Sequence, residues 1–170
     1  MAELIKKILV PVDGSKISEK ALEYASWVAG KTGAQVTLLH VVDADKLKLT
    51  YEAMDKFLPE WKDKVKGDDI KRYSPFFEEQ LSCMMEDPLC KRGNNVLKEM
   101  TKYAEKNGLK VKTILKMGRV VDTIVQTADD EHSDHIIMGK TGLTGIKRLA
   151  MGHVAEDVAK YAGVRVTLVP

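Results

Sequence analysis

Short apolar runs alternate along the chain with longer stretches in which apolar residues recur every three or four positions. Apolar runs occupy residues 8–10, 36–42 and 136–138, and such runs are typical of strands buried on both faces of a sheet. In residues 110–116 and 164–169, apolar or β-branched residues instead alternate with charged or polar ones. Alternation favours strands near the rim of a sheet, with one face more polar than the other. The pattern therefore predicts five strands.

The periodic stretches between these strands predict helices with one apolar face. Polar capping residues or glycines precede the stretches, and glycines end the first two of them. We expect helices to begin at Ser15 or Ser18, at Asn94 or Asn95, after Gly118 and Arg119, and at Gly152, with stops at Gly33 and Gly108. The stripes expected to be buried are Leu22, Ala25, Val28 and Ala29; Val96, Leu97, Met100 and Ala104; Val121, Ile124, Val125 and Ala128; and Val154, Val158 and Tyr161.

This alternation of strands and helices predicts one α/β domain over residues 1–170, with an open, parallel, five-stranded, Rossmann-like sheet. Helices should cover both faces, and the crossovers should be right-handed. Ligands of such sheets bind at the carboxyl ends of strands, where the winding reverses. Asp13, Val41 and Gly139 all fall at predicted carboxyl ends, so we expect a site there.

The segment from Asp134 to Ala155 carries the strongest local signal for that site. Its strand is followed by Gly139 and Gly142, and Gly152 precedes a helix. Glycine lets backbone N–H groups approach a bound group closely, and a helix N-terminus favours phosphate. Lysines and an arginine between the glycines add positive charge. One interpretation is a phosphate cradle; the other is a strand-to-helix loop that needs glycine only to turn.

Composition narrows the classes of protein that fit the chain. Its 170 residues are 44% hydrophobic and 31% charged, which is typical of a globular domain. A net charge of +2 gives no argument for a nucleic-acid or membrane partner. The first residues do not resemble a signal peptide, and no apolar run is long enough to span a bilayer. We expect a cytoplasmic protein.

Residues 44–93 form a predicted insertion after the second strand, because a connection in such a fold usually has about six residues. The segment holds six of the ten aromatic residues, so we expect two or three short helices. They would pack on the sheet, on a second subunit or on a protein partner, or form a lid over the rim of the ligand site. Cys83 and Cys90 both lie in it. We expect reduced structural thiols, with a disulfide as the alternative.

Two stretches together resemble the universal stress protein family. The first is Ile8-Leu9-Val10-Pro11-Val12-Asp13-Gly14-Ser15, and the second is the spacing Gly139-x2-Gly142-x9-Gly152. The resemblance covers residues 1–43 and 94–170. It implies the fold of adenine-nucleotide α-hydrolase-like proteins and a stress-response module. In this family the last strands of two subunits pair, which implies a homodimer.

The resemblance also implies an adenine-nucleotide site that takes ATP, ADP or AMP, with or without Mg²⁺. His153 stands where the family has Ser or Thr, so a protein-interaction module without nucleotide is the alternative function. Asp13 could instead serve only as an Asx turn before Gly14. The implied binding residues are Pro11, Val12, Asp13, Val41, Met138, Gly139, Thr141, Gly142, Gly152, His153, Val154 and Ala155.

Motifs of dedicated enzymes are absent from the sequence. It has no P-loop, no dinucleotide fingerprint and no Ser-Gly-Gly-x-Asp signature, so we assign no catalytic residue and expect at most slow ATP hydrolysis. His40, inside an apolar strand, is expected to be a hydrogen-bonded core residue rather than a ligand. His132 and His135 are expected to face solvent rather than bind metal, and Arg119 is expected to be solvated.

Overall fold

The sheet is built around β1 (Lys7–Pro11), whose Ile8, Leu9 and Val10 are almost completely buried. A computed structural model of the chain describes residues 5–43, 88–142 and 151–170. The remaining elements, in chain order, are α1 (Lys16–Thr32), β2 (Gln35–Asp43), α5 (Pro88–Lys106), β3 (Val111–Gly118), α6 (Val120–Asp130), β4 (His135–Gly139), α7 (His153–Tyr161) and β5 (Arg165–Val169).

All five strands are parallel and lie in the order β3-β2-β1-β4-β5. The chain winds outward from β1 through β2 to β3, and then continues on the other side of β1 with β4 and β5. The winding therefore reverses between β1 and β4, which is where open α/β sheets bind ligands. The predicted five-stranded parallel sheet is confirmed, with β3 and β5 at its edges.

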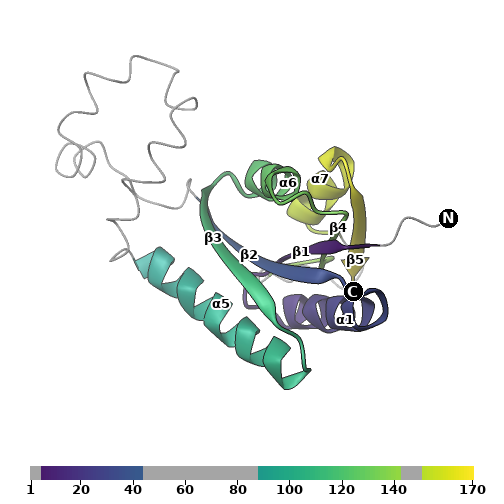
Figure 1. Ribbon diagram of the computed structural model, residues 1–170. Helices are drawn as coiled ribbons and strands as arrows, with labels where there is room; N and C mark the ends of the chain where they lie inside the picture. The colour runs from purple at the N-terminus through teal and green to yellow at the C-terminus, as the bar shows by residue number, and fades with distance from the viewer. Residues whose placement is uncertain (1–4, 44–87, 143–150) are drawn as a thin grey trace, which may run out of the picture.

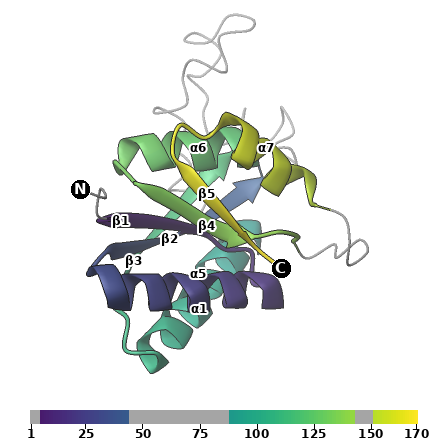
Figure 2. The ribbon, with the colours of Figure 1, turned by 90° about the vertical axis from the view of Figure 1, so that its right-hand side faces the viewer.

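Helices cover both faces of the sheet, as predicted (Figures 1 and 2). On one face, α1 and α5 bury the side chains of Ile8, Val10 and Leu38. On the other face, α6 and α7 cover Leu9 and Ile136. Each face therefore has its own apolar core, which explains why the central strands are apolar at successive positions.

The first helix begins and ends at residues that the sequence predicted. Ser15 is the N-cap of α1, and its side chain accepts a hydrogen bond from the backbone N–H of Ser18 at 3.1 Å. Gly33 closes the helix at a φ of 74°, a left-handed conformation that glycine adopts without steric cost. The predicted stripe of α1 is buried.

Helix α5 begins at Pro88 rather than at Asn94 or Asn95. Both asparagines are exposed within the helix, and Cys90 and Gly93, one turn earlier, are buried. Proline is favoured in the first turn of a helix, so a start at Pro88 satisfies local chemistry as well as packing. The rest of the predicted insertion lies outside the described residues, as does Cys83.

The stripe predicted for α7 was partly wrong. Val158 is buried as predicted, but the other buried residue of the helix is Ala155, and Tyr161 is 63% exposed. Val154 is 37% exposed, because a helix of nine residues on the edge of the sheet buries only a narrow stripe. In α6, Thr127 is buried in place of the predicted Val125. No helix in the described ranges has the length and apolar character needed to cross a membrane.

Candidate functional site

A cavity of about 340 Å³ opens at the carboxyl ends of β1, β2 and β4. It is bordered by the start of α7, by the start of α6 and by Ser18 of α1. All twelve residues predicted for binding line this cavity. The structure adds six that sequence reasoning did not assign to the site: Ser18, Leu39, His40, Val120, Ile124 and Lys140.

Asp13 belongs both to a turn and to the cavity wall. Its Oδ1 accepts a hydrogen bond from the backbone N–H of Ser15 at 2.9 Å, which is the predicted Asx contact. Its Oδ2 faces the loop after β4, since a Cβ placed on Gly142 would lie 2.9 Å from this oxygen. The turn therefore holds the carboxylate at the mouth of the cavity, and the two interpretations of Asp13 are compatible.

The glycines after β4 allow the chain to pass very close to its neighbours. A Cβ on Gly139 would lie 2.7 Å from Cγ2 of Ile17 and 3.1 Å from the carbonyl oxygen of Thr141. The N–H of Gly152 donates to the carbonyl of Lys140 at 2.9 Å, and the N–H of Lys140 donates to Val169 at 2.7 Å. These bonds bring the two ends of the loop together, while residues 143–150 lie outside the described part of the chain.

The N-terminus of α7 opens into the cavity without a capping side chain. Gly152 is the N-cap, with no side-chain hydrogen bond. In the described ranges, no acceptor contacts the N–H groups of His153, Val154 and Ala155. These donors and the positive end of the helix dipole favour an anion. The exposed His153 side chain lies at the same helix end.

The opposite side of the cavity is apolar. Leu39 and Ile124 are buried there, and Val41 and Val120 are half-buried and pack against the same core. The two α6 residues were missed because sequence periodicity does not reveal which strand a helix covers. The sequence did offer one indication: Gly118 ends β3 at the carboxyl end of the sheet, so the start of α6 has to lie beside the cavity.

Three polar residues considered from sequence lie outside the cavity. Arg119 is exposed, as predicted, and its Nη1 lies 3.7 Å from Oδ2 of Asp122. His132 is exposed, also as predicted. The expectation that His135 faces solvent was wrong: it is 9% exposed, and its Nε2 lies 2.7 Å from Oγ1 of Thr167.

His135 is buried because it is the first residue of β4, between β1 and β5. Its Nδ1 is buried with no hydrogen-bond partner in the described structure. Burial lowers the pKa of His135 below its usual 6.5, and the positive charge of Arg165 lowers it further. Both effects favour the neutral ring. No cluster of three or more potential metal-binding side chains occurs within the described ranges.

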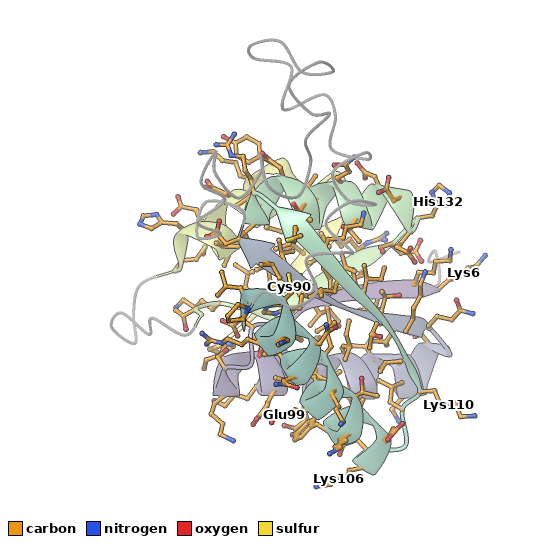
Figure 3. The ribbon with its side chains drawn as sticks, turned by 90° about the vertical axis from the view of Figure 1, so that its left-hand side faces the viewer. Lys6, Cys90, Glu99, Lys106, Lys110 and His132 are labelled. Carbon is orange, nitrogen blue, oxygen red and sulfur yellow. The ribbon has the colours of Figure 1, made fainter. Side chains whose placement is uncertain are left out.

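A second cavity, of about 390 Å³, lies at the amino ends of β1, β2 and β3. Lys7, Lys110 and Lys112 line it, and Figure 3 shows Lys110 and Lys6 near this end of the sheet. Two of the lining lysines are already engaged by the end of α6. Lys112 contacts the Glu131 carboxylate at 2.7 Å, and Lys7 donates to the Glu131 carbonyl at 3.1 Å. The carboxyl-end cavity, whose α7 N–H donors have no acceptor among the described residues, is therefore the stronger candidate.

Comparison with known proteins gives consistent matches over almost the whole chain. The sequence model of the universal stress protein family matches residues 4–170 of this chain. Universal stress protein MJ0531 of Methanocaldococcus jannaschii is 31% identical over 169 residues, which cover 98% of this chain and 82% of the relative. The solved structure of MJ0577, from the same organism, has a TM-score of 0.69 at 30% identity, covering 98% of this chain and 96% of the other.

Two further solved structures contain nucleotides. A universal stress protein from Archaeoglobus fulgidus is described in complex with dAMP; it has a TM-score of 0.61 at 19% identity, covering 99% of this chain and 100% of the other. Another, in complex with cAMP, has a TM-score of 0.60 at 18% identity, covering 99% and 98% of the two chains. At these identities the likeness shows a shared fold.

Proposed function

The chain belongs to the universal stress protein family, and we propose that it is a regulatory module that binds an adenine nucleotide in the cavity at the carboxyl ends of β1, β2 and β4. One observation carries this proposal. The uncapped N-terminus of α7 and the close-packed glycines after β4 lie at one end of a cavity whose other side is apolar. Such a cavity matches a molecule with a phosphate at one end and a flat, largely apolar group at the other.

The chemistry of the walls suggests an orientation for the nucleotide. The apolar surface of Val41, Val120 and Ile124 suits the base. Asp13, whose Oδ2 faces Gly142, suits the ribose hydroxyls, because a carboxylate accepts hydrogen bonds from them. The N–H groups of residues 153–155 then meet the phosphates. The nucleotide complexes of two relatives support this proposal.

ATP, ADP and AMP all fit this arrangement of walls, and the phosphate chain would extend past His153. Mg²⁺ usually binds through phosphates and one or two carboxylates, and Asp13 places a carboxylate in the wall of this cavity. We assign no catalytic residue. We propose that the protein acts in a stress response through the presence or absence of a bound nucleotide, and not through nucleotide hydrolysis. We also propose that it forms a homodimer in which the β5 strands of two copies pair.

Calorimetric titration with ATP, ADP, AMP and GTP tests the proposal. The wild-type protein should bind the adenine nucleotides at one site per chain and GTP more weakly. Gly142→Val should weaken binding at least about tenfold, because even a Cβ at this position would lie 2.9 Å from Oδ2 of Asp13. Gly30→Ala is the matched control, since nothing lies within 4 Å of its added Cβ.

His153 supports a second candidate function, a protein-interaction module that binds no nucleotide. Its imidazole is at the first position of α7, where it could fill the space that a phosphate would need. This alternative predicts that no nucleotide binds to the wild-type protein and that His153→Ser gains binding. The same titration therefore separates the two functions.

A further inference from the structure

The first half of α5 packs against the part of the sheet that holds Asp13. A Cβ on Gly93 would lie 2.7 Å from Cδ2 of His40 and 2.7 Å from Cδ1 of Leu115. One turn later, Val96 approaches the β1–α1 loop: a Cβ on Gly14 would lie 3.1 Å from its Cγ2. Helix α5 therefore lies directly over the His40 ring and the turn that follows Asp13 (α5 is seen from its outer side, at Cys90, in Figure 3).

His40 lies between α5 and the end of β1. Its Nδ1 lies 2.7 Å from the carbonyl oxygen of Val12. A carbonyl oxygen can only accept a hydrogen bond, so the Nδ1 atom carries the proton and donates it. The other side of the ring is covered by Gly93 of α5. The half-buried ring is thus held between α5 and the residue that precedes Asp13.

Both polar groups of the Val12 backbone are consequently fixed by β2. The N–H of Val12 donates to the carbonyl of Leu39 at 2.8 Å, and its carbonyl accepts from His40 at 2.7 Å. Val12 lies past the last paired residue of β1, Pro11, so no regular ladder holds its carbonyl. Without the His40 bond, the carbonyl of the peptide that joins Val12 to Asp13 would lose its hydrogen bond to β2, and the turn at Ser15 would have to hold Asp13 without that support.

We propose that His40 is a positioning residue for the nucleotide site. His40 holds the Val12 carbonyl, and this bond helps to place the carboxylate of the next residue, Asp13. Because His40 also contacts α5, the position of Asp13 depends on how α5 packs. This inference rests on the proposed adenine-nucleotide function. His40 also lines the cavity, but in this scheme it acts through Val12 and donates no hydrogen bond to the nucleotide.

The test compares two substitutions of nearly equal shape. In His40→Asn, the side-chain amide can place an N–H donor close to the position of Nδ1. In His40→Leu, the side chain branches at the same carbon but has no donor. A typical hydrogen bond contributes enough to change an equilibrium constant by up to about tenfold. We expect AMP affinity to fall roughly fivefold to tenfold in His40→Leu and to be largely restored in His40→Asn.

Amide hydrogen exchange of the ligand-free proteins gives a second readout. Faster exchange at residues 13–15 in His40→Leu, with unchanged exchange in β4 and α6, is the expected signature of a freed loop. Faster exchange throughout the molecule would instead indicate general destabilisation. That result would overturn the positioning role, as would equal AMP affinity for wild type and His40→Leu.

The outcomes also separate this inference from the proposed function. If wild type binds AMP and both variants bind equally weakly, nucleotide binding stands and the role of the hydrogen bond is refuted. If wild type binds no adenine nucleotide, the proposed function fails, and the positioning of a nucleotide site fails with it. Loop exchange that is then still faster in His40→Leu than in His40→Asn would show that His40 orders the loop for another purpose.

Discussion

At the scale of single residues, His153 decides what the phosphate end of the cavity can accept. It is the first residue of α7, it is exposed, and it lies beside N–H groups that have no acceptor in the described structure. A ring N–H of the imidazole can donate a hydrogen bond to a phosphate oxygen, but the ring also occupies space at this end of the cavity. His153 therefore either contacts the phosphates or fills the place that they would need.

Substituting His153 by Ala should distinguish these two roles. If the ring donates to the phosphates, we expect His153→Ala to bind ATP several-fold more weakly than wild type, because a hydrogen bond to a charged group is lost. Calorimetric titration of both proteins with ATP measures the difference. Tighter ATP binding by His153→Ala would show that the ring fills the phosphate position instead.

His135 predicts a pH dependence of stability rather than of binding. Because burial and Arg165 lower its pKa in the folded state, the unfolded chain takes up the proton more readily. The stability that the neutral His135 ring contributes is fully present above the ordinary pKa of 6.5. It is lost as pH falls through the lower pKa of the folded state. The free energy of unfolding should therefore decrease between about pH 7 and about pH 5.

The neighbouring carboxyl group acts in a different pH range. Hydrogen bonds from the backbone N–H groups of Lys6 and Lys7 lower the pKa of Asp134 below 3.8, so its contribution is lost only in stronger acid. Urea unfolding at several pH values should show a smaller loss between pH 7 and 5 for His135→Gln. The exposed His132→Gln is the control and should behave like wild type; a loss unchanged in His135→Gln would contradict the assignment.

The positions of site residues were predictable where strand ends determine them. Asp13, Val41 and Gly139 lie at or near the carboxyl ends of strands. These ends necessarily meet at one edge of a parallel sheet, and all three residues line the cavity. The tertiary contacts of histidines were not predictable in this way. His135 is the first residue of β4 rather than the residue before it, and this shift of one position makes its side chain buried instead of exposed.

At the scale of elements, α5 shows why helix boundaries and close contacts escape sequence analysis. Asn94 and Asn95 are good capping residues, but they are exposed in the middle of α5. The helix continues back to Pro88 because Cys90 and Gly93 pack on β2 and β3. Helical periodicity could not indicate that glycine is needed at Gly93, since the need arises from His40 and Leu115 in other elements.

Two glycine-to-alanine changes within helices should consequently have opposite effects. Gly30→Ala in α1 adds a methyl group in open space and should stabilise the protein by about 0.5–1 kcal/mol, the difference in helix propensity. Gly93→Ala in α5 places its Cβ 2.7 Å from His40 and Leu115 and should destabilise by about 1–3 kcal/mol. Denaturant unfolding measures both, and a stabilising Gly93→Ala would contradict the packing described for α5.

At the scale of the whole molecule, the two edges of the sheet differ in their suitability for pairing. The β3 edge has Lys112 and Lys116, which contact Glu131 and Asp130, and lysines protect an edge from association. The β5 edge instead has half-buried Val166 and Leu168, and Figure 2 shows this strand at the edge facing the viewer. We propose that β5 pairs with β5 of a second copy.

A proline at the right position should separate such a dimer. The carbonyl of Val169 accepts from Lys140, next to β4, so by alternation the backbone groups of Val166 point to the open edge. Val166→Pro removes an outward N–H without removing a bond to β4. Sedimentation should show a wild-type dimer and a folded Val166→Pro monomer at micromolar concentration. A monomeric wild-type protein, or a variant that remains a dimer, would rule out pairing through β5.

The claim that an adenine nucleotide binds between β1, β4 and α7 is tested most directly by an NMR titration of the isotopically labelled protein with AMP. The backbone amides of Gly14, Gly139, Gly142 and Gly152 lie at the cavity or next to Asp13, whereas those of Gly30 and Gly108 lie away from it. We predict saturable shifts for the first four glycines and none for the other two. Absence of saturable shifts with AMP, ADP and ATP at millimolar concentration, or shifts confined to the lysines at the amino end of the sheet, would contradict the proposed site.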